Sequence, residues 1–299
     1  MKLIRYKNNP ILKPKRENNW ESYAVYNCGV YYDGKIVQML YRAVGEDRVS
    51  RFGYAWSRDG INFARLPKPV FEPYPPLKFI RGTKYECRGV EDPRITYLNN
   101  KFYITYVATS PEWLGARTYL ATTKDFKHLK RLREVMPEID DRNIVLFPEK
   151  VGNKYVLYHR IPPSVWVAYS NNLKTWKGHQ IVMTPRKKEW DCYKIGPTGP
   201  PIKTEKGWLL FYHGVDEKFT YRLGMALFDL KNPAKLIACQ KEPILEPERY
   251  EELWGMTPNV VFSCGTIEKD GKYWVYYGAA DTVVSLAWVE KNKALDFLK

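Results

Sequence analysis

The stretch Val30-Tyr31-Tyr32-Asp33-Gly34-Lys35-Ile36-Val37-Gln38-Met39-Leu40-Tyr41 decides the fold of this chain of 299 residues. Two runs of β-branched and aromatic residues flank a short polar turn that contains Asp-Gly, a strong local signal for a β-hairpin. The same pattern returns four more times. The turns of the later copies are Asn99-Asn100-Lys101, Gly152-Asn153-Lys154, Glu205-Lys206-Gly207 and Asp270-Gly271-Lys272.

The hairpins recur at similar intervals. With the third turn residue as the anchor, which is Lys35 in the first copy, successive copies lie 66, 53, 53 and 65 residues apart. Each unit continues into a second hairpin-like piece, such as Tyr54-Ala55-Trp56-Ser57, and no convincing amphipathic helix interrupts the series. Five four-stranded units predict an all-β fold, a five-bladed β-propeller forming one domain over residues 1–299. An irregular β-sandwich is the competing interpretation, and the repeat spacing favours the propeller.

The composition limits the classes of function. The net charge of +15 predicts a field that attracts anions, but the 48 Lys and Arg are scattered, so we expect neither nucleic acid nor a membrane as a partner. Ten Trp and 23 Tyr suit both β-sheet cores and the faces of sugar rings. Five cysteines without a close pair predict free thiols in a reducing compartment. Since no apolar stretch resembles a signal peptide or a membrane helix, we expect a cytoplasmic protein.

The densest group of chemically active side chains is Cys87-Arg88-Gly89-Val90-Glu91-Asp92-Pro93-Arg94, where two acids lie between two arginines at the start of a strand. Neighbouring residues in a strand point to opposite faces. We therefore expect one of Glu91 and Asp92 to face the central channel of the predicted propeller and the other to hold a neighbouring loop. The alternative is a purely structural turn stabilised by local pairing of Asp and Arg.

Two successive units each supply an entering and a leaving cation or imidazole. Arg142, followed by Asn143, enters the third unit and Arg160 leaves its next strand, while Lys194 and His213 take the matching places in the fourth unit. Each alone would be a surface cation or a satisfied histidine. Because their positions in the repeat match, we predict that they face one channel and bind an oxyanion, for which guanidinium groups are well suited.

Three further residues take matching places in the first and last units. Asp281 follows Gly278-Ala279-Ala280, Arg42 follows Tyr41, and Asn27 precedes Cys28-Gly29. We expect them to bond to sugar hydroxyls, although Asp281 would also suit a turn cap.

These motifs resemble glycoside hydrolase family 130, whose members are five-bladed propellers that act on β-mannosides. The most specific match is residues 89–94, and the supporting matches are Arg142-Asn143, His159-Arg160, Lys194-Ile195-Gly196, Tyr212-His213-Gly214 and Gly278–Asp281. The resemblance implies that Asp92 is the general acid, acting through a hydroxyl of the bound mannose. It further implies phosphate binding by Arg142, Asn143, Arg160, Lys194 and His213, and substrate contacts from Asn27, Arg42, Arg48, Glu91, Arg94 and Asp281. Cys28 departs from the family, which has proline there.

The resemblance implies inverting phosphorolysis of β-mannosides, preferentially β-1,2-linked ones, to α-mannose 1-phosphate and a shortened sugar. Inorganic phosphate is the expected co-substrate, with no metal and no other cofactor. Open alternatives are a hydrolase on the same scaffold, β-1,4 linkages to mannose, glucose or N-acetylglucosamine, an arabinan- or fructan-cleaving enzyme with three carboxylates, and a non-catalytic sugar-binding propeller. We expect the loops Tyr74–Tyr85 and Lys187–Tyr193 to select the acceptor, and an exposed aromatic surface would suit a homodimer.

Overall fold

β-Strands make up most of the protein, which confirms the predicted all-β class. The computed structural model describes residues 1–73, 89–109, 116–137 and 139–296. Within these ranges the helical elements are short: η1 (Asn19–Glu21), α1 (Tyr250–Leu253) and α2 (Lys291–Ala294). None of these described helices has the length and apolar character needed to span a membrane.

The described strands form five antiparallel groups. Three of the groups are separate sheets, while the first two groups belong to one eight-stranded sheet and are joined by the single parallel pair of Ser50 and Gly89. The strands of these first two groups are β2 (Ala24–Tyr32), β3 (Val37–Val44), β4 (Ser50–Ser57), β5 (Ala64–Arg65), β6 (Gly89–Leu98), β7 (Lys101–Thr109), β8 (Arg117–Thr123) and β9 (Lys130–Glu134).

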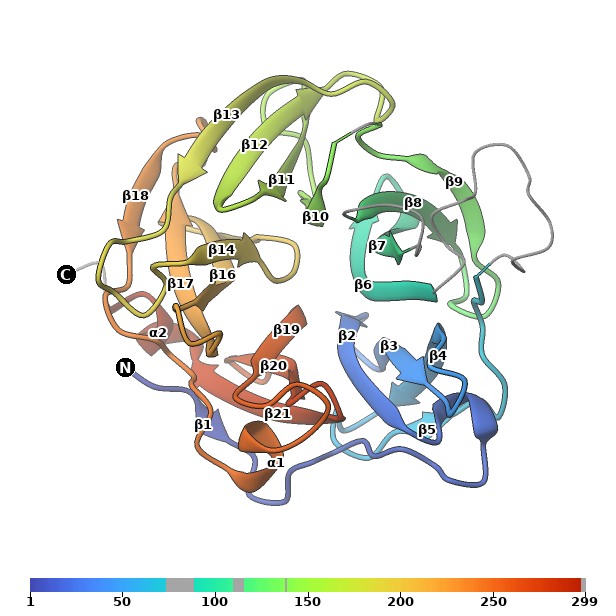
Figure 1. Ribbon diagram of the computed structural model, residues 1–299. Coiled ribbons are helices and arrows are strands. Elements are labelled where there is room, and N and C mark those ends of the chain that lie inside the picture. The colour runs from blue at the N-terminus through green and yellow to red at the C-terminus, as the bar shows by residue number, and fades with distance from the viewer. Residues whose placement is uncertain (74–88, 110–115, 138, 297–299) are drawn as a thin grey trace.

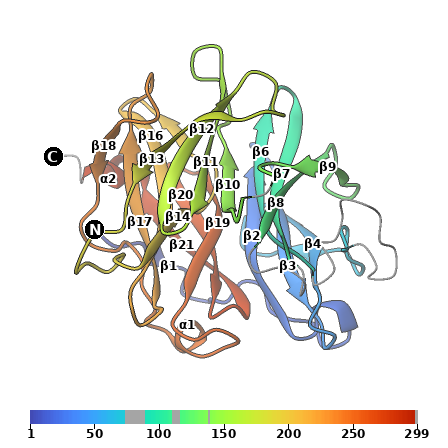
Figure 2. The same cartoon turned by 45° about the horizontal axis from the view of Figure 1, so that its top comes forward.

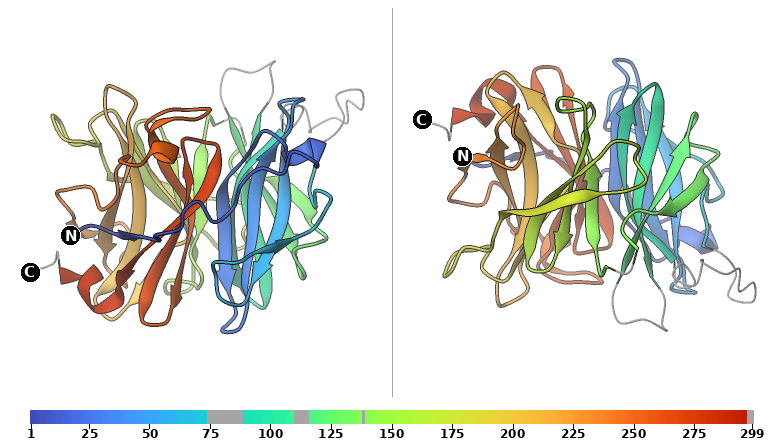
Figure 3. Two further views of the ribbon diagram at one scale, coloured as in Figure 1. Left: turned by 90° about the horizontal axis from the view of Figure 1, so that it is seen from below. Right: turned by 90° about the horizontal axis from the view of Figure 1, so that it is seen from above.

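The remaining groups follow in chain order, and the fifth is completed by the first strand of the chain. β1 pairs with β21, so the first and the last strand of the chain lie side by side in the same group (Figures 1, 2 and 3). The strands are β10 (Arg142–Leu146), β11 (Tyr155–Ile161), β12 (Ser164–Ser170) and β13 (Lys177–Met183); β14 (Lys194–Pro197), β15 (Ile202–Thr204), β16 (Gly207–Val215), β17 (Tyr221–Phe228) and β18 (Leu236–Cys239); and β19 (Val261–Lys269), β20 (Lys272–Ala279), β21 (Val283–Glu290) and β1 (Ile4–Arg5).

The groups stand around a common centre, with β2, β6, β10, β14 and β19 innermost (Figure 1). Buried apolar residues fill the spaces between neighbouring groups rather than one central core, and this packing continues from the fifth group back to the first. Pairs that share a buried cluster across such a boundary are Leu40 and Ile104, Leu120 and Leu157, Tyr158 and Tyr212, Phe211 and Tyr273, and Tyr276 and Met39.

Proline modifies two strands that the hairpin pattern predicts. β10 ends at Leu146, shortly before the turn Gly152-Asn153-Lys154, because Pro148 has no N–H for the ladder. Pro200 and Pro201 likewise separate β14 from β15, although both strands pair with β16.

Four cysteines are free thiols, as predicted: Cys28, Cys192, Cys239 and Cys264. Cys87 and Arg88 lie outside the described residues, as does the predicted acceptor loop Tyr74–Tyr85.

Candidate active site

One cavity of about 250 Å³ collects side chains from all five groups of strands. Nine of the twelve predicted site residues line it, so segments far apart in the sequence do meet there. The complete lining is Asn27, Arg42, Glu91, Asp92, Arg142, Asn143, Arg160, Lys194, Tyr221, Thr257, Val260, Phe262 and Asp281.

The same backbone irregularity aims three of these side chains into the cavity. Asn27, Asp92 and Asn143 have φ values of 44°, 53° and 59°, and the pairing register shifts at each of them. Asn and Asp tolerate this left-handed conformation better than other residues with a side chain, and a bulge changes the direction of the side chain. The prediction that Glu91 and Asp92 face opposite ways is therefore wrong: both line the cavity because the bulge interrupts the alternation.

Arg42 and Asn27 organise the acidic end of the cavity. Nη2 of Arg42 donates to Oε1 of Glu91 at 2.8 Å, and its Nη1 donates to Oδ1 of Asp92 at 3.3 Å. Nδ2 of Asn27 donates to the same Oδ1 at 3.0 Å. Both bonds to the Asp92 carboxyl group thus end on Oδ1, and Oδ2 has no hydrogen-bond partner among the described residues.

Three carboxyl groups at this end share one nearby guanidinium, and their environments differ. Burial raises the pKa of Asp281 to about 6; a hydrogen bond from Thr257 and the charge of Arg42 oppose that rise, while Asp92 and Glu91 add to it. Burial also raises the pKa of Glu91, with Arg42 opposing and Asp92 reinforcing the change. Asp281 and Glu91 therefore lose their protons at higher pH than free carboxyl groups do.

The other end of the cavity is cationic. Arg142 and Arg160 face each other across β10 and β11, and both line the cavity with Lys194. Burial, followed by the positive charges of Arg142 and Arg94, lowers the pKa of Arg160 to about 10, while Tyr221 and Asp141 oppose the change. Nε of Arg160 is buried without a hydrogen-bond partner in the described structure. No carboxyl group among the described residues forms a salt bridge with Arg142 or Lys194, and an anionic ligand would relieve the excess of positive charge at this end.

Two predicted residues lie behind the lining. Arg94 is buried and donates from Nη2 to Oδ1 of Asn143 at 2.8 Å and from Nη1 to the carbonyl of Asp92 at 2.9 Å. His213 is fully buried, neither ring nitrogen has a partner among the described residues, and burial followed by the charge of Arg160 puts its pKa well below the usual value. Both residues therefore contact or border the lining rather than the open cavity.

Gly196 allows this close arrangement. A Cβ atom at position 196 would lie 2.6 Å from Cε1 of His213 and 2.9 Å from Nδ2 of Asn143. Arg48, in contrast, is exposed and lies outside the lining, with its guanidinium 3.5 Å from the centre of the Tyr23 ring.

Four lining residues carry no functional signal that was recognised in the sequence. Tyr221 opens β17, and its ring centre lies 5.2 Å from Nζ of Lys194; an aromatic residue at the start of the strand after His213 was the available signal. Thr257 and Val260 come from the irregular segment between α1 and β19, where no repeat pattern exists to identify them. Phe262 packs on His213 with ring centres 4.8 Å apart and reads as an ordinary core residue in the sequence.

A neighbouring cavity of about 440 Å³ shares the three cations. Arg142, Arg160 and Lys194 line both spaces, and Tyr193, at the end of the second predicted acceptor loop, lines only the neighbouring one. The rest of its lining is Asp140, Pro162 and Pro163.

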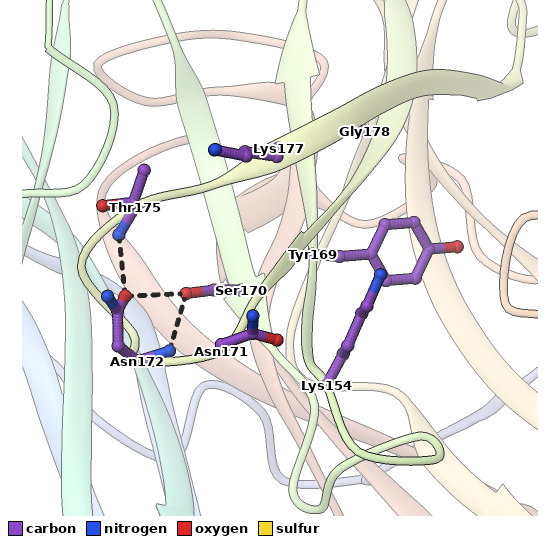
Figure 4. Close-up of a pocket in the computed structure, with 8 residues that line it drawn as sticks. All are labelled: Lys154, Tyr169, Ser170, Asn171, Asn172, Thr175, Lys177 and Gly178. Carbon is purple, nitrogen blue, oxygen red and sulfur yellow. Dashed lines mark hydrogen bonds between the residues drawn. The ribbon is translucent and has the colours of Figure 1, made fainter.

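Another cavity, of about 330 Å³, has different chemistry (Figure 4). It lies beside the turn between β12 and β13, with Tyr169 on one side and Thr175 on the other. Its eight described lining residues include Lys154 and Lys177 but no carboxyl group. This cavity therefore has no carboxylic acid that could donate a proton, unlike the cavity that Asp92 lines. Among the described residues, no three His, Cys, Asp or Glu side chains gather in a way that could hold a metal ion.

Known proteins resemble this chain over nearly its whole length. The family model described as beta-1,4-mannooligosaccharide phosphorylase, glycoside hydrolase family 130, matches residues 2–299. A beta-1,2-mannobiose phosphorylase and a 1,2-beta-oligomannan phosphorylase of Thermoanaerobacter sp. (strain X514) are 47% and 44% identical to the chain; the matches cover 98% and 97% of the chain and 98% of each relative. The solved complex of Listeria innocua beta-1,2-mannobiose phosphorylase with beta-1,2-mannobiose superposes with a TM-score of 0.88 at 28% identity, over 100% of this chain and 99% of that one.

Proposed function

The chain belongs to glycoside hydrolase family 130, and on that premise we propose that it cleaves β-mannosides with inorganic phosphate. One observation carries the proposal: a single cavity has carboxyl groups at one end and Arg142, Arg160 and Lys194 at the other. A phosphorylase needs a proton donor for the leaving oxygen and a cradle for an anionic nucleophile. It needs no second carboxylate to activate water.

In the proposed reaction, phosphate in the cationic end attacks the anomeric carbon of a bound mannose. The bond from that carbon to the leaving oxygen breaks, and the leaving oxygen receives a proton that originates on Asp92. Since Arg42 and Asn27 both donate to Oδ1, we assign the transferable proton to Oδ2, which is free to donate to a hydroxyl of the mannose. The products are α-mannose 1-phosphate and a shortened sugar, because attack from the opposite side inverts the anomeric centre.

Each cation has a role in the proposal. Arg142 and Arg160 offer paired N–H donors to phosphate oxygens, and Lys194 adds a point charge. Asn143, held by Arg94, and neutral His213 support the cradle from its buried side. Glu91 and Arg42 orient Asp92, while Asp281 and Asn27 are placed to bind sugar hydroxyls.

Three carboxyl groups in one cavity also meet the count required by the rival arabinan- or fructan-cleaving enzymes, for which the sequence offers only Asp92 and Asp281. Glu91 is the added group, and its bonds to Arg42 at 2.8 Å and from Thr109 at 3.2 Å make it a structural partner. Arg142 and Lys194 have no salt-bridge partner in the part of the chain that the structure describes, which favours phosphate over water as the nucleophile.

We assign the preferred linkage as β-1,2, because the two Thermoanaerobacter relatives are named for β-1,2-mannobiose and 1,2-β-oligomannan. β-1,4-linked mannose, as in the description of the family model, is the second candidate. We further propose that the five groups of strands are the blades of a five-bladed propeller acting as one domain. This assignment is supported by the five inter-group clusters.

Location, assembly and cofactor use complete the proposal. The composition suits a cytoplasmic enzyme without nucleic-acid or membrane partners, and we assign no metal or organic cofactor to it. A homodimer would cover the exposed rings of Tyr250 and Trp254, and sedimentation velocity distinguishes it from a monomer.

The decisive experiment incubates the protein with β-1,2-mannobiose, with and without inorganic phosphate, after treatment with a chelator. We expect α-mannose 1-phosphate to appear only with phosphate, and β-1,4-mannobiose to react more slowly. Equal release of free mannose without phosphate would establish a hydrolase instead, and unchanged disaccharide in both arms would favour a binding protein.

A further inference from the structure

A buried acid–imidazole pair lies next to the cationic end of the cavity. Oδ2 of Asp141 is 2.6 Å from Nδ1 of His159, and the two side chains are 1% and 0% exposed. Neither residue lines the cavity, so neither can touch a ligand there.

The pair stands back to back with the two arginines of the cradle. Asp141 directly precedes Arg142, and His159 directly precedes Arg160. Arg142 and Arg160 are themselves cross-strand partners in β10 and β11. His159 lies on β11, where neighbouring side chains point to opposite faces, and Asp141 lies directly before β10. Since only the two arginines line the cavity, the bond between Asp141 and His159 joins the two segments from behind it.

Residues on three other strands contact the Asp141–His159 pair. Oγ1 of Thr118, on β8, donates to the carbonyl of Asp141 at 3.0 Å. The His159 ring packs near Trp166 on β12, and its Nε2 lies 3.4 Å from Nδ1 of His179 on β13. The rear face of the cradle is therefore fixed by packing, while the front face holds two like charges.

Those like charges create the need for such a clamp. After burial, the charge of Arg142 is the largest cause of the lowered pKa of Arg160, so the two guanidinium groups repel each other when no anion lies between them. Moving the strands apart would relieve that repulsion and widen the cradle.

We infer that the Asp141–His159 hydrogen bond holds β10 and β11 in the register that sets the spacing of Arg142 and Arg160 for phosphate. Asp141 and His159 are thus positioning residues. The inference rests on the proposed function, because it concerns the same phosphate cradle.

Two amide substitutions at one position test the inference. His159→Asn can place its Nδ2 near the original Nδ1 and keep the bond to Asp141, whereas His159→Gln places its Nε2 near the original Nε2 and loses that bond. The exposed pair of His128 and Asp125 is the matched control. Nδ1 of His128 lies 2.7 Å from Oδ2 of Asp125, but the His128 side chain is 86% exposed.

Initial rates are measured against phosphate and against β-1,2-mannobiose, and phosphate binding is measured separately by calorimetry. We expect His159→Gln to raise the KM and the Kd for phosphate about tenfold or more, with the KM for the disaccharide changed less than about twofold. His159→Asn should recover most of the phosphate affinity, and His128→Gln should match the wild type.

A folded His159→Gln variant with the phosphate affinity of the wild type would overturn the inference, as would an equal loss of affinity for phosphate and disaccharide. If the His159 variants do not fold, the ring nitrogen resonances of His159 in the wild-type protein provide the test. They should shift saturably as phosphate is added, and their invariance at saturation would sink the idea. A wild-type protein that turns over without phosphate would instead contradict the proposed function.

Discussion

Nδ2 of Asn27 donates a hydrogen bond to Oδ1 of Asp92 at 3.0 Å, although 65 residues separate them. Both residues occupy the left-handed region at a bulge of an inner strand, in two neighbouring groups. The bond occupies one carboxyl oxygen of Asp92 and leaves the other available for proton transfer. The same bulge with a left-handed residue, repeated in two strands, therefore brings an amide and a carboxyl group into contact in the cavity.

Asp92→Asn should abolish most turnover while phosphate still binds. The amide keeps the size of the side chain but cannot supply the proton, and general acid catalysis is worth about 10²- to 10⁴-fold in rate. The measurement combines kcat for phosphorolysis with calorimetric titration of phosphate. A variant that keeps more than about a tenth of the wild-type kcat would show that Asp92 is not the proton donor.

Arg142→Ala should mainly weaken the use of phosphate. One lost charge-assisted interaction of roughly 1.5–3 kcal/mol corresponds to a rise of about 10- to 100-fold in the KM for phosphate. The KM for β-1,2-mannobiose should change much less. Lys154→Ala is the control, because it removes one positive charge from the separate cavity of Figure 4. Equal effects of the two variants would mean that only the overall charge matters.

Gly196→Ala should damage the cradle through space rather than charge. The new Cβ atom would clash with His213 and Asn143, and overpacking of this kind costs about 1–3 kcal/mol. We expect a higher KM for phosphate together with a lower thermal midpoint. Gly34→Ala is the matched control, since its Cβ meets no atom within 4 Å but its φ of 92° is strained for alanine. The control should lose stability without a change in the KM for phosphate.

Asp281→Asn should alter how stability depends on pH. Burial raises the pKa of Asp281 to about 6 from the usual 3.8, so the folded state binds more protons than the unfolded state between these values. Its contribution to stability is therefore fully present below about pH 4 and is lost as the pH rises through about 6. At pH 7.5 the variant should be more stable than the wild type by at most about 3 kcal/mol.

The difference in urea unfolding free energy between Asp281→Asn and the wild type, taken at several pH values from 4.5 to 7.5 without ligand, measures this effect. The difference should grow with pH and level off above about pH 6.5. A difference that stays constant across the range would show that Asp281 does not titrate there.

The sequence by itself determined the strand-rich fold and much of the membership of the site. Hairpin turns such as Asp33-Gly34-Lys35 are local signals, since the backbone conformation of a turn depends on the few residues within it. Matching positions in the repeat then identified Arg142, Arg160 and Lys194 as partners, because repeated units place equivalent residues at equivalent points around a common centre.

Only the tertiary structure decided which way those side chains point. The alternation rule put Glu91 and Asp92 on opposite faces, but the positive φ of Asp92 puts both carboxyl groups in one cavity beside Arg42. Arg94 and His213 lie behind the lining, and Arg48 lies at the surface, although the family resemblance implied substrate contacts from Arg48 and Arg94 and phosphate binding by His213. The direction of a side chain depends on bulges and on contacts between strands that are distant in the sequence. A local sequence pattern does not contain this information.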